Sequence, residues 1–252
     1  MAPFFAIDKL YYLLAALFYL AAMMVFIFRQ RKCALGLLLA GFALHTCFLW
    51  KRAWTLGFLS PNAFFEGLYF LPWCLGLLSI GLKVFAKNKS LADSIIILIF
   101  FLSLPASFFP GGIIPPSPKS QTIFSSLFFF FEVLAQACFI LGAWLGLLYL
   151  RQQEEARIFH SFLIWGFVFY SLAQVVGAYW SYLGWATPLH WSNRHLQSAS
   201  LWCFYAAILH LRFLPDWPLR QEARFSILGF FLVLLFNIGA QISERAITRL
   251  GG

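Results

Sequence analysis

Long apolar stretches separated by short polar segments run through the whole chain. Eight of them cover approximately residues 8–28, 33–50, 62–82, 91–109, 121–150, 158–183, 196–214 and 225–243. Each is close to the length of about 20 residues that a helix needs to cross a bilayer. The pattern therefore predicts an all-α polytopic membrane protein, an eight-transmembrane-helix bundle in which residues 1–252 form a single membrane domain.

The composition supports this class. Hydrophobic residues make up 62% of the chain and charged residues 11%, with a mean hydropathy of +0.81. These values exclude a soluble globular domain. The first stretch has only Lys9 near its start and no small-residue cleavage site, so we expect a retained helix instead of a signal peptide.

Basic residues are concentrated in alternate connections, which predicts the orientation. One set of connections holds Arg29, Arg31, Lys32, Lys83, Lys87, Lys89, Arg151, Arg157, Arg212, Arg220 and Arg224. The positive-inside rule assigns that set to the cytoplasm of a bacterial-type inner (plasma) membrane. Both termini and the loops around 51–61, 110–120 and 184–195 then face outward. The net charge of +9 is accordingly read as a topology signal, and no nucleic-acid partner is expected.

The five cysteines, Cys33, Cys47, Cys74, Cys138 and Cys203, are scattered singly. No CxxC motif and no Cys/His pair occurs. We therefore expect neither a metal-thiolate centre, nor a thioredoxin-like site, nor a disulfide scaffold.

His45 lies deep in the second apolar stretch, and His210 lies in the seventh. Ionisable groups at membrane depth are costly and usually face a partner or a cavity. A hydrogen bond to a neighbouring helix is the commoner role of a single such histidine. Two neutral imidazoles from different helices can also supply both axial ligands of a haem iron.

Tryptophans are concentrated before the seventh stretch, in a predicted Trp-rich external loop over 180–195. Trp180, Trp185 and Trp191 lie where the aromatic belt of any membrane protein would lie. Alternatively, their rings could stack on a planar ligand and cover it.

Two blocks of the chain resemble CcsA-type (system II) cytochrome c assembly proteins. The first block matches at Gly177, Trp180, Trp185, Trp191, Trp202, Tyr205, His210 and Arg212, and the second at His45, Arg52, Gly57, Glu66, Leu68, Phe70 and Trp73. The resemblance implies that His45 and His210 ligate the iron of a haem b, with Trp185 and Trp191 facing it. It also implies partners among other cytochrome c assembly membrane proteins, within the lipid of the membrane.

The chain departs from the family in the outward-facing part. The family's Trp-x-Trp-Asp-Pro core falls on residues 189–193, which read LHWSN, and its two outer histidine ligands fall on about Phe128 and Thr248. The resemblance thus implies that the external haem site of a full synthase is absent, and no catalytic residue is assigned. His190, beside Trp191, is a further candidate for haem binding, and His195 is a second histidine near it. A loop histidine at the water interface is the commoner role for residues in such positions.

The function expected from the resemblance is handling or export of haem for cytochrome c biogenesis. An alternative is the HemX-type branch, which His190 before Trp191 and the sequence FEGLYF (65–70) resemble more closely. That resemblance implies regulation of haem synthesis, with glutamyl-tRNA reductase as the partner. The embedded Glu66 and Glu132 leave a proton-coupled transporter as a third class, although no pair of helices is broken in matching halves. Hydrolase and kinase motifs do not occur.

Overall fold

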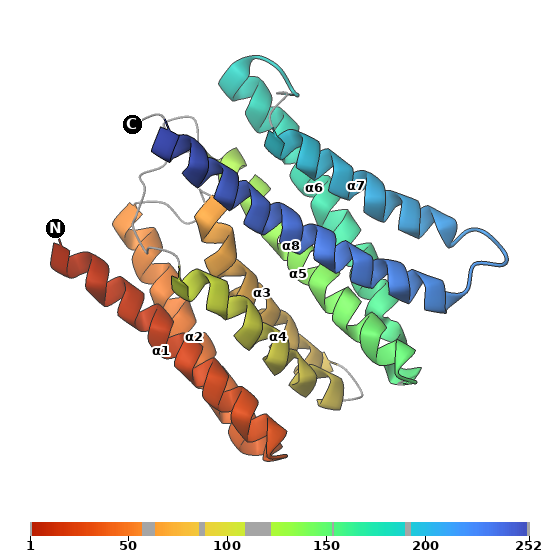
Figure 1. Cartoon of the computed structure of the whole chain (residues 1–252), viewed down its shortest axis with the longest axis horizontal. Coiled ribbons are helices and arrows are strands. Elements are labelled where there is room, and N and C mark those ends of the chain that lie inside the picture. Colours follow the sequence, from red (N-terminus) through yellow and green to blue (C-terminus); the bar gives the residue numbers. More distant parts are fainter. Residues whose placement is uncertain are drawn as a thin grey trace. The chain divides into compact units, whose positions relative to one another are not determined.

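The computed structural model describes residues 2–56, 64–85, 89–108, 122–152, 154–189 and 193–250. Across these residues the chain is helical and contains no strand (Figure 1). The helices are α1 (Ala2–Ile27), α2 (Arg31–Leu56), α3 (Phe64–Phe85), α4 (Lys89–Phe108), α5 (Ile123–Leu150), the short 3-10 helix η2 (Glu154–Ile158), α6 (Phe159–Trp185), α7 (Asn193–Leu211) and α8 (Leu219–Leu250).

Six helices are long and apolar enough to cross a membrane, within the residues described. The candidate spans are Lys9–Ile27, Arg31–Trp54, Gly67–Val84, Leu91–Phe108, Ile123–Leu150 and Ala156–Trp185. A multi-pass all-α membrane protein is therefore confirmed, while the predicted count of eight spans is not. α7 starts with polar Asn193, Arg194 and His195, and α8 starts with three charged residues in its first six positions.

The chain divides into two compact units, Met1–Ser117 and Pro118–Gly252. We describe each unit by itself. That residues 1–252 act as a single membrane domain stays a prediction.

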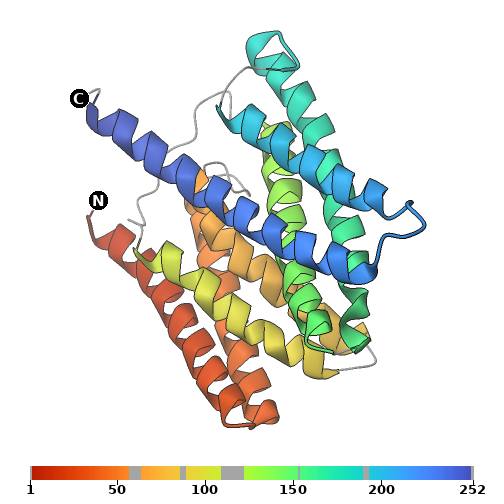
Figure 2. The same ribbon diagram turned by 45° about the vertical axis from the view of Figure 1, so that its right-hand side comes forward.

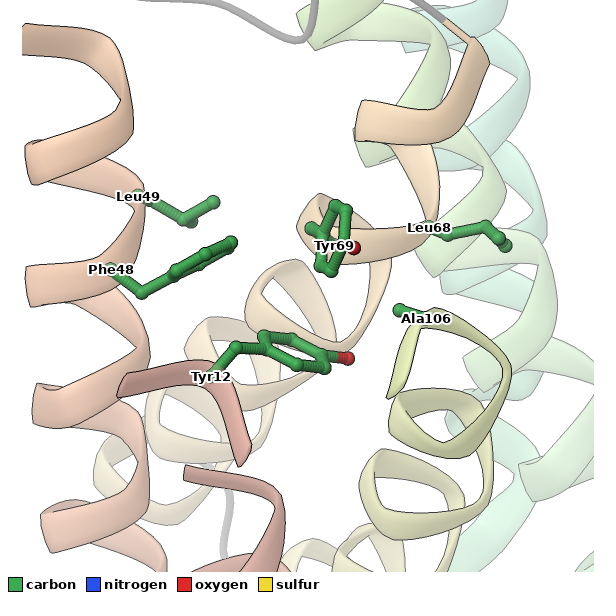
Figure 3. Close-up of a cluster of buried hydrophobic side chains, with 6 residues drawn as sticks. All are labelled: Tyr12, Phe48, Leu49, Leu68, Tyr69 and Ala106. Carbon is green, nitrogen blue, oxygen red and sulfur yellow. The ribbon is translucent and has the colours of Figure 1, made fainter. Parts of the chain in front are cut away.

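The first unit consists of α1–α4. α1 packs along α2, α3 packs along α4, and α1 also contacts α4 (Figure 2). Figure 3 shows the core side chains that meet between these helices: Tyr12 from α1, Phe48 and Leu49 from α2, Leu68 and Tyr69 from α3, and Ala106 from α4. A tight turn at 28–30, with Arg29 in the left-handed region at φ 62°, joins α1 to α2.

The second unit is organised around α5, whose residues are mostly buried. α5 packs along α6 and α8, and α7 contacts both α6 and α8. Glycine permits the close approach of α6 to α5, since a Cβ at Gly166 would lie 2.7 Å from two ring carbons of Phe139. Alternation of helix direction brings the 151–158 and 212–218 connections to the same end of this unit.

The predicted Trp-rich loop 180–195 is shorter than expected. α6 continues through Trp180 to Trp185, and α7 begins at Asn193. α6 ends because Ala186 adopts the left-handed conformation (φ 57°) and donates its N–H to the Tyr182 carbonyl at 2.8 Å. Trp180 and Trp185 thus lie on α6, and the connection between α6 and α7 begins after them.

The loop predicted at 51–61 also starts later in the structure than the sequence indicated. α2 continues through Lys51 and Arg52 to Leu56. Both cations lie over aromatic rings of the first unit, Lys51 over Tyr11 at 5.3 Å and Arg52 over Tyr69 at 5.5 Å. Lys and Arg are good helix formers, so both residues can continue the helix, and the cation–π contacts hold their charged groups against aromatic rings.

Candidate haem-binding site

His45 lies in the middle of α2 and is completely buried. Its Nδ1 atom is 3.1 Å from the hydroxyl oxygen of Tyr19 on α1. The ring of Tyr12, two turns before Tyr19 on α1, meets the imidazole edge-on at a centroid distance of 5.2 Å. Phe48 approaches from α2 itself at 6.2 Å. The imidazole therefore sits in an aromatic enclosure held by two adjacent helices.

The second ring nitrogen of His45 is the unusual feature of this enclosure. Nε2 is buried and makes no hydrogen bond of ordinary geometry with any described residue, although the backbone of Tyr69 lies near the ring. A buried polar atom without a partner is rare in native proteins and costs free energy. An imidazole nitrogen that lacks a protein partner is chemically suited to bind a metal ion.

His210 lies in the last turn of α7 and is exposed in the structure. Its Nδ1 atom is 2.8 Å from the backbone carbonyl oxygen of Ala206, four residues earlier. Because a carbonyl can only accept, Nδ1 must be the donor. In a neutral imidazole the lone pair is then on Nε2, which is the tautomer that ligates iron through Nε2.

The two histidines belong to different units, His45 to the first and His210 to the second. Among the predicted covering residues, Trp185 is 38% exposed and meets Trp180 edge-on at 5.6 Å. His190 and Trp191 lie outside the described residues. His195 is described, half-buried, in the first turn of α7.

Phe128 occupies one of the positions that the resemblance assigns to an outer histidine. Its ring stacks on Trp180 at a centroid distance of 5.8 Å and lies directly against Gly177. Phe128 and Trp180 are part of a buried cluster with Phe129 and Ala173. At this position the chain therefore has tight apolar packing in place of a metal-ligating side chain.

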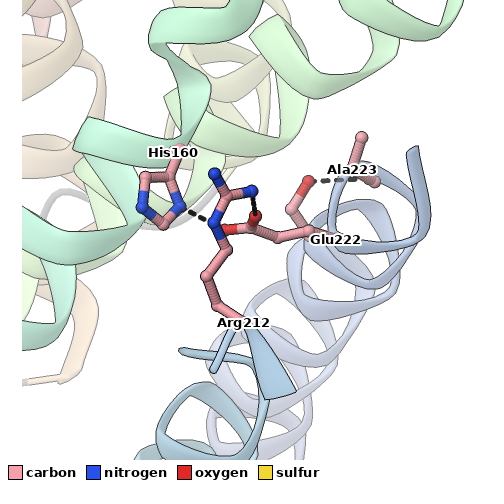
Figure 4. Close-up of polar contacts among 5 residues, drawn as sticks. His160, Arg212, Glu222 and Ala223 are labelled. Carbon is pink, nitrogen blue, oxygen red and sulfur yellow. Dashed lines mark hydrogen bonds and ion pairs between the residues drawn. The ribbon is translucent and has the colours of Figure 1, made fainter. Parts of the chain in front are cut away.

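A polar cluster that sequence reasoning missed lies at the junction of α6, α7 and α8 (Figure 4). The Glu222 carboxylate is completely buried; one oxygen pairs with His160 Nδ1, and the other accepts a hydrogen bond from Arg212 Nη1 at 3.1 Å. The available clue was that Arg212 and Glu222 flank a connection short enough to bring them together. His160, 62 residues from Glu222, offered no such clue.

Glu132, unexplained by its sequence context, is also placed by the structure. It projects from α5 and is buried, and the hydroxyl of Ser198 on α7 donates a hydrogen bond to its Oε1 atom at 3.3 Å. The carboxylate thus links α5 to α7, and Glu132 has an identified structural contact.

Comparison with known proteins completes the description. Residues 8–247 match the family model described as Cytochrome C assembly protein. The chain belongs to this family. The resemblance that the two sequence blocks indicated is therefore confirmed over nearly the whole chain.

Curated relatives of this family member include CcsA proteins of cyanobacteria. The chain is 37% identical over 88 residues to "Cytochrome c biogenesis protein CcsA" of Prochlorococcus marinus (strain MIT 9515), an alignment that covers 35% of this chain and 28% of the relative. It is 28% identical over 86 residues to the protein of the same name from Thermosynechococcus vestitus (strain NIES-2133 / IAM M-273 / BP-1), covering 34% of this chain and 27% of that protein. Each alignment thus spans only slightly more than a quarter of the relative.

Proposed function

We propose that this protein binds b-type haem and handles or exports it in cytochrome c biogenesis. Membership of the Cytochrome C assembly family and the similarity to CcsA proteins support the proposal. The observation that carries it is the pair of membrane histidines: a buried imidazole with an unpartnered Nε2 atom, and a second whose Nδ1 hydrogen bond leaves Nε2 free to ligate.

His45 and His210 would hold the haem iron as its two axial ligands. Bound haem would supply a planar iron centre that leaves both ligand positions to the protein. Trp185 and Trp191 would cover the porphyrin with apolar surface, and His190 would lie beside Trp191 at the outward side. Because the His45 ring is fully covered by its neighbours, the aromatic side chains around it must separate from the ring to admit the porphyrin.

The proposed setting is the inner membrane of a bacterial-type cell, with α7 and α8 completing eight spans and both termini outside. Other cytochrome c assembly proteins are the proposed partners. The HemX-type alternative, with glutamyl-tRNA reductase as partner, receives no support from the comparisons. A proton-coupled transporter is disfavoured by the placement of Glu132, whose buried carboxylate has a structural partner in the Ser198 hydroxyl on α7.

The test is the optical spectrum of the full-length protein purified in detergent. We expect a low-spin, bis-imidazole haem spectrum, which His45→Ala or His210→Ala removes or strongly weakens. His160→Gln is the matched control, because it alters a histidine of the second unit but keeps a group able to hydrogen-bond to Glu222. Full haem retention in the doubly substituted protein would contradict the proposed ligands.

Added imidazole sharpens this test. His210 is exposed whereas His45 is completely buried, so exogenous imidazole should restore the spectrum of His210→Gly far better than that of His45→Gly.

The expected stoichiometry is one haem per chain, because Phe128 is packed against Trp180 and Gly177. A second haem lost on His190→Ala or His195→Ala would instead indicate an outer site built by that connection.

A further inference from the structure

The hydroxyl of Tyr19 is the side-chain group that hydrogen-bonds to His45, at Nδ1. It lies on the face of α1 that meets α2, together with Tyr12 seven residues earlier and with buried Ala15 and Ala22. These two alanines are small enough to let the helices approach closely. The Tyr19 side chain is completely buried, so its hydroxyl has no access to solvent as a competing partner.

Gly41 is the residue that gives Tyr19 this position. It lies on α2 one turn before His45, and a Cβ added there would lie 2.9 Å from both Cδ1 and Cε1 of the Tyr19 ring. Real Cβ atoms do not come this close to ring carbons. The ring thus rests on the bare backbone at Gly41, and this contact directs its hydroxyl toward the imidazole.

We infer that Tyr19, seated on Gly41, is a positioning residue that orients His45 and tunes it as an iron ligand. The inference rests on the proposed haem function. A neutral imidazole that ligates iron through Nε2 carries its proton on Nδ1 and needs an acceptor there. The Tyr19 oxygen, 3.1 Å from Nδ1, is placed to accept that proton's hydrogen bond.

Two consequences follow for a bound haem. The hydrogen bond fixes the ring orientation, so haem should be held more tightly with it than without it. It also increases the electron density that the imidazole donates, which stabilises ferric relative to ferrous iron and lowers the midpoint potential.

The experiment compares Tyr19→Phe with Tyr170→Phe in the full-length protein. Both changes remove one hydroxyl from a buried tyrosine of a long helix, but Tyr170 lies on α6 in the second unit, where its ring packs against Phe139. We expect Tyr19→Phe to weaken haem binding roughly 10–100-fold and to raise the haem midpoint potential. Tyr170→Phe should leave the potential at the wild-type value.

Gly41→Ala provides an independent route to the same result. It keeps the hydroxyl but displaces the ring, so it should shift the potential in the same direction as Tyr19→Phe. Gly36→Ala on the same helix is its control, because a Cβ there meets no atom within 4 Å.

The outcomes separate this inference from the proposed function. A wild-type protein without bis-imidazole haem overturns both. Haem in wild type, with the potential and retention unchanged in Tyr19→Phe, overturns the inference alone, as does an equal shift in Tyr170→Phe. A raised potential in Tyr19→Phe and Gly41→Ala, absent from both controls, supports it.

Discussion

At the scale of single residues, several polar side chains within the apolar helices form hydrogen bonds with nearby groups of the chain. Thr46 donates its hydroxyl hydrogen to the Phe42 carbonyl at 2.8 Å and accepts from Trp73 Nε1 at 2.9 Å. The Ser107 hydroxyl donates a hydrogen bond to the Ser103 carbonyl on the preceding turn. Such bonds remove the cost of placing polar atoms in hydrocarbon. Four buried side-chain atoms of the described residues lack such a partner, His45 Nε2, Gln174 Nε2, the Tyr205 hydroxyl and Trp217 Nε1. Of these, the imidazole nitrogen of His45 is the candidate iron ligand.

Gly177 provides a residue-scale prediction about packing. A Cβ at this position would lie 2.7 Å from Cδ2 of Phe128, whose ring is fixed by its stack on Trp180. We expect Gly177→Ala to lower the free energy of unfolding by about 1–3 kcal/mol, because neither ring can yield without disturbing the cluster. Denaturant unfolding in detergent, followed by tryptophan fluorescence, measures the change.

Gly81→Ala is the control for that measurement. Gly81 is also inside a membrane-length helix, but a Cβ there meets no atom within 4 Å. The substitution should be neutral or slightly stabilising, since alanine favours the helix by about 0.5–1 kcal/mol. Equal effects of the two substitutions would show that Phe128 does not press on Gly177 as described.

At the scale of helices, the buried carboxylate of Glu222 joins three elements. It connects the start of α6, the end of α7 and the start of α8 through His160 and Arg212. Arg212 is only two residues beyond His210 in the sequence. The cluster therefore fixes the end of α7 that carries the proposed ligand.

Removing this carboxylate should loosen the junction. We expect Glu222→Ala to destabilise the protein by about 2 kcal/mol, through loss of the hydrogen bonds that the carboxylate makes to Arg212 and His160. A double-mutant cycle with Arg212→Gln should give a coupling energy of only about 1 kcal/mol, because the Arg212 side chain is 40% exposed and partly screened by solvent. Thermal unfolding of the four proteins in detergent gives these values.

Arg220→Gln tests whether any loss of positive charge in this connection has the same effect. Arg220 is exposed and lies on the same first turn of α8 as Glu222. Its substitution should change stability by less than about 0.5 kcal/mol. A coupling energy of zero between Arg212 and Glu222 would contradict the role assigned to the cluster.

Helices were predictable from the sequence because about 20 consecutive apolar residues leave few alternatives to a membrane helix. Their ends were less predictable. α6 continues past Gly184 to Trp185, and α2 continues past Lys51 and Arg52, whose charged groups lie over aromatic rings. Such contacts depend on partners that are distant in the sequence, so a local pattern cannot predict them.

The candidate site was predictable to a similar extent. The ligand candidates His45 and His210 follow from histidines placed in apolar stretches and from family resemblance. The residues that orient and support them do not, because Tyr19 and Gly41 look like ordinary helix residues until α1 is packed on α2. His160 and Glu222 likewise meet only through packing of α6 and α8.

For the molecule as a whole, the orientation in the membrane decides what the Trp-rich segment can do. The basic residues predict that the connections at 28–32 and 212–218 lie in the cytoplasm, with the connection after Trp185 outside. Single cysteines test this in a background where the exposed Cys33, Cys47 and Cys203 become serine and the buried Cys74 and Cys138 become alanine.

Gln30→Cys, Asp216→Cys and Leu189→Cys place one thiol at an exposed position in each connection without removing a basic residue. In intact cells an impermeant thiol reagent should label Leu189→Cys only; Gln30→Cys and Asp216→Cys should label after lysis. Retained haem in each variant verifies folding. The reverse labelling would place the Trp-rich segment in the cytoplasm, where haem held beside it could not be passed to an acceptor outside the membrane. Export would then be excluded even if His45 and His210 were shown to bind haem.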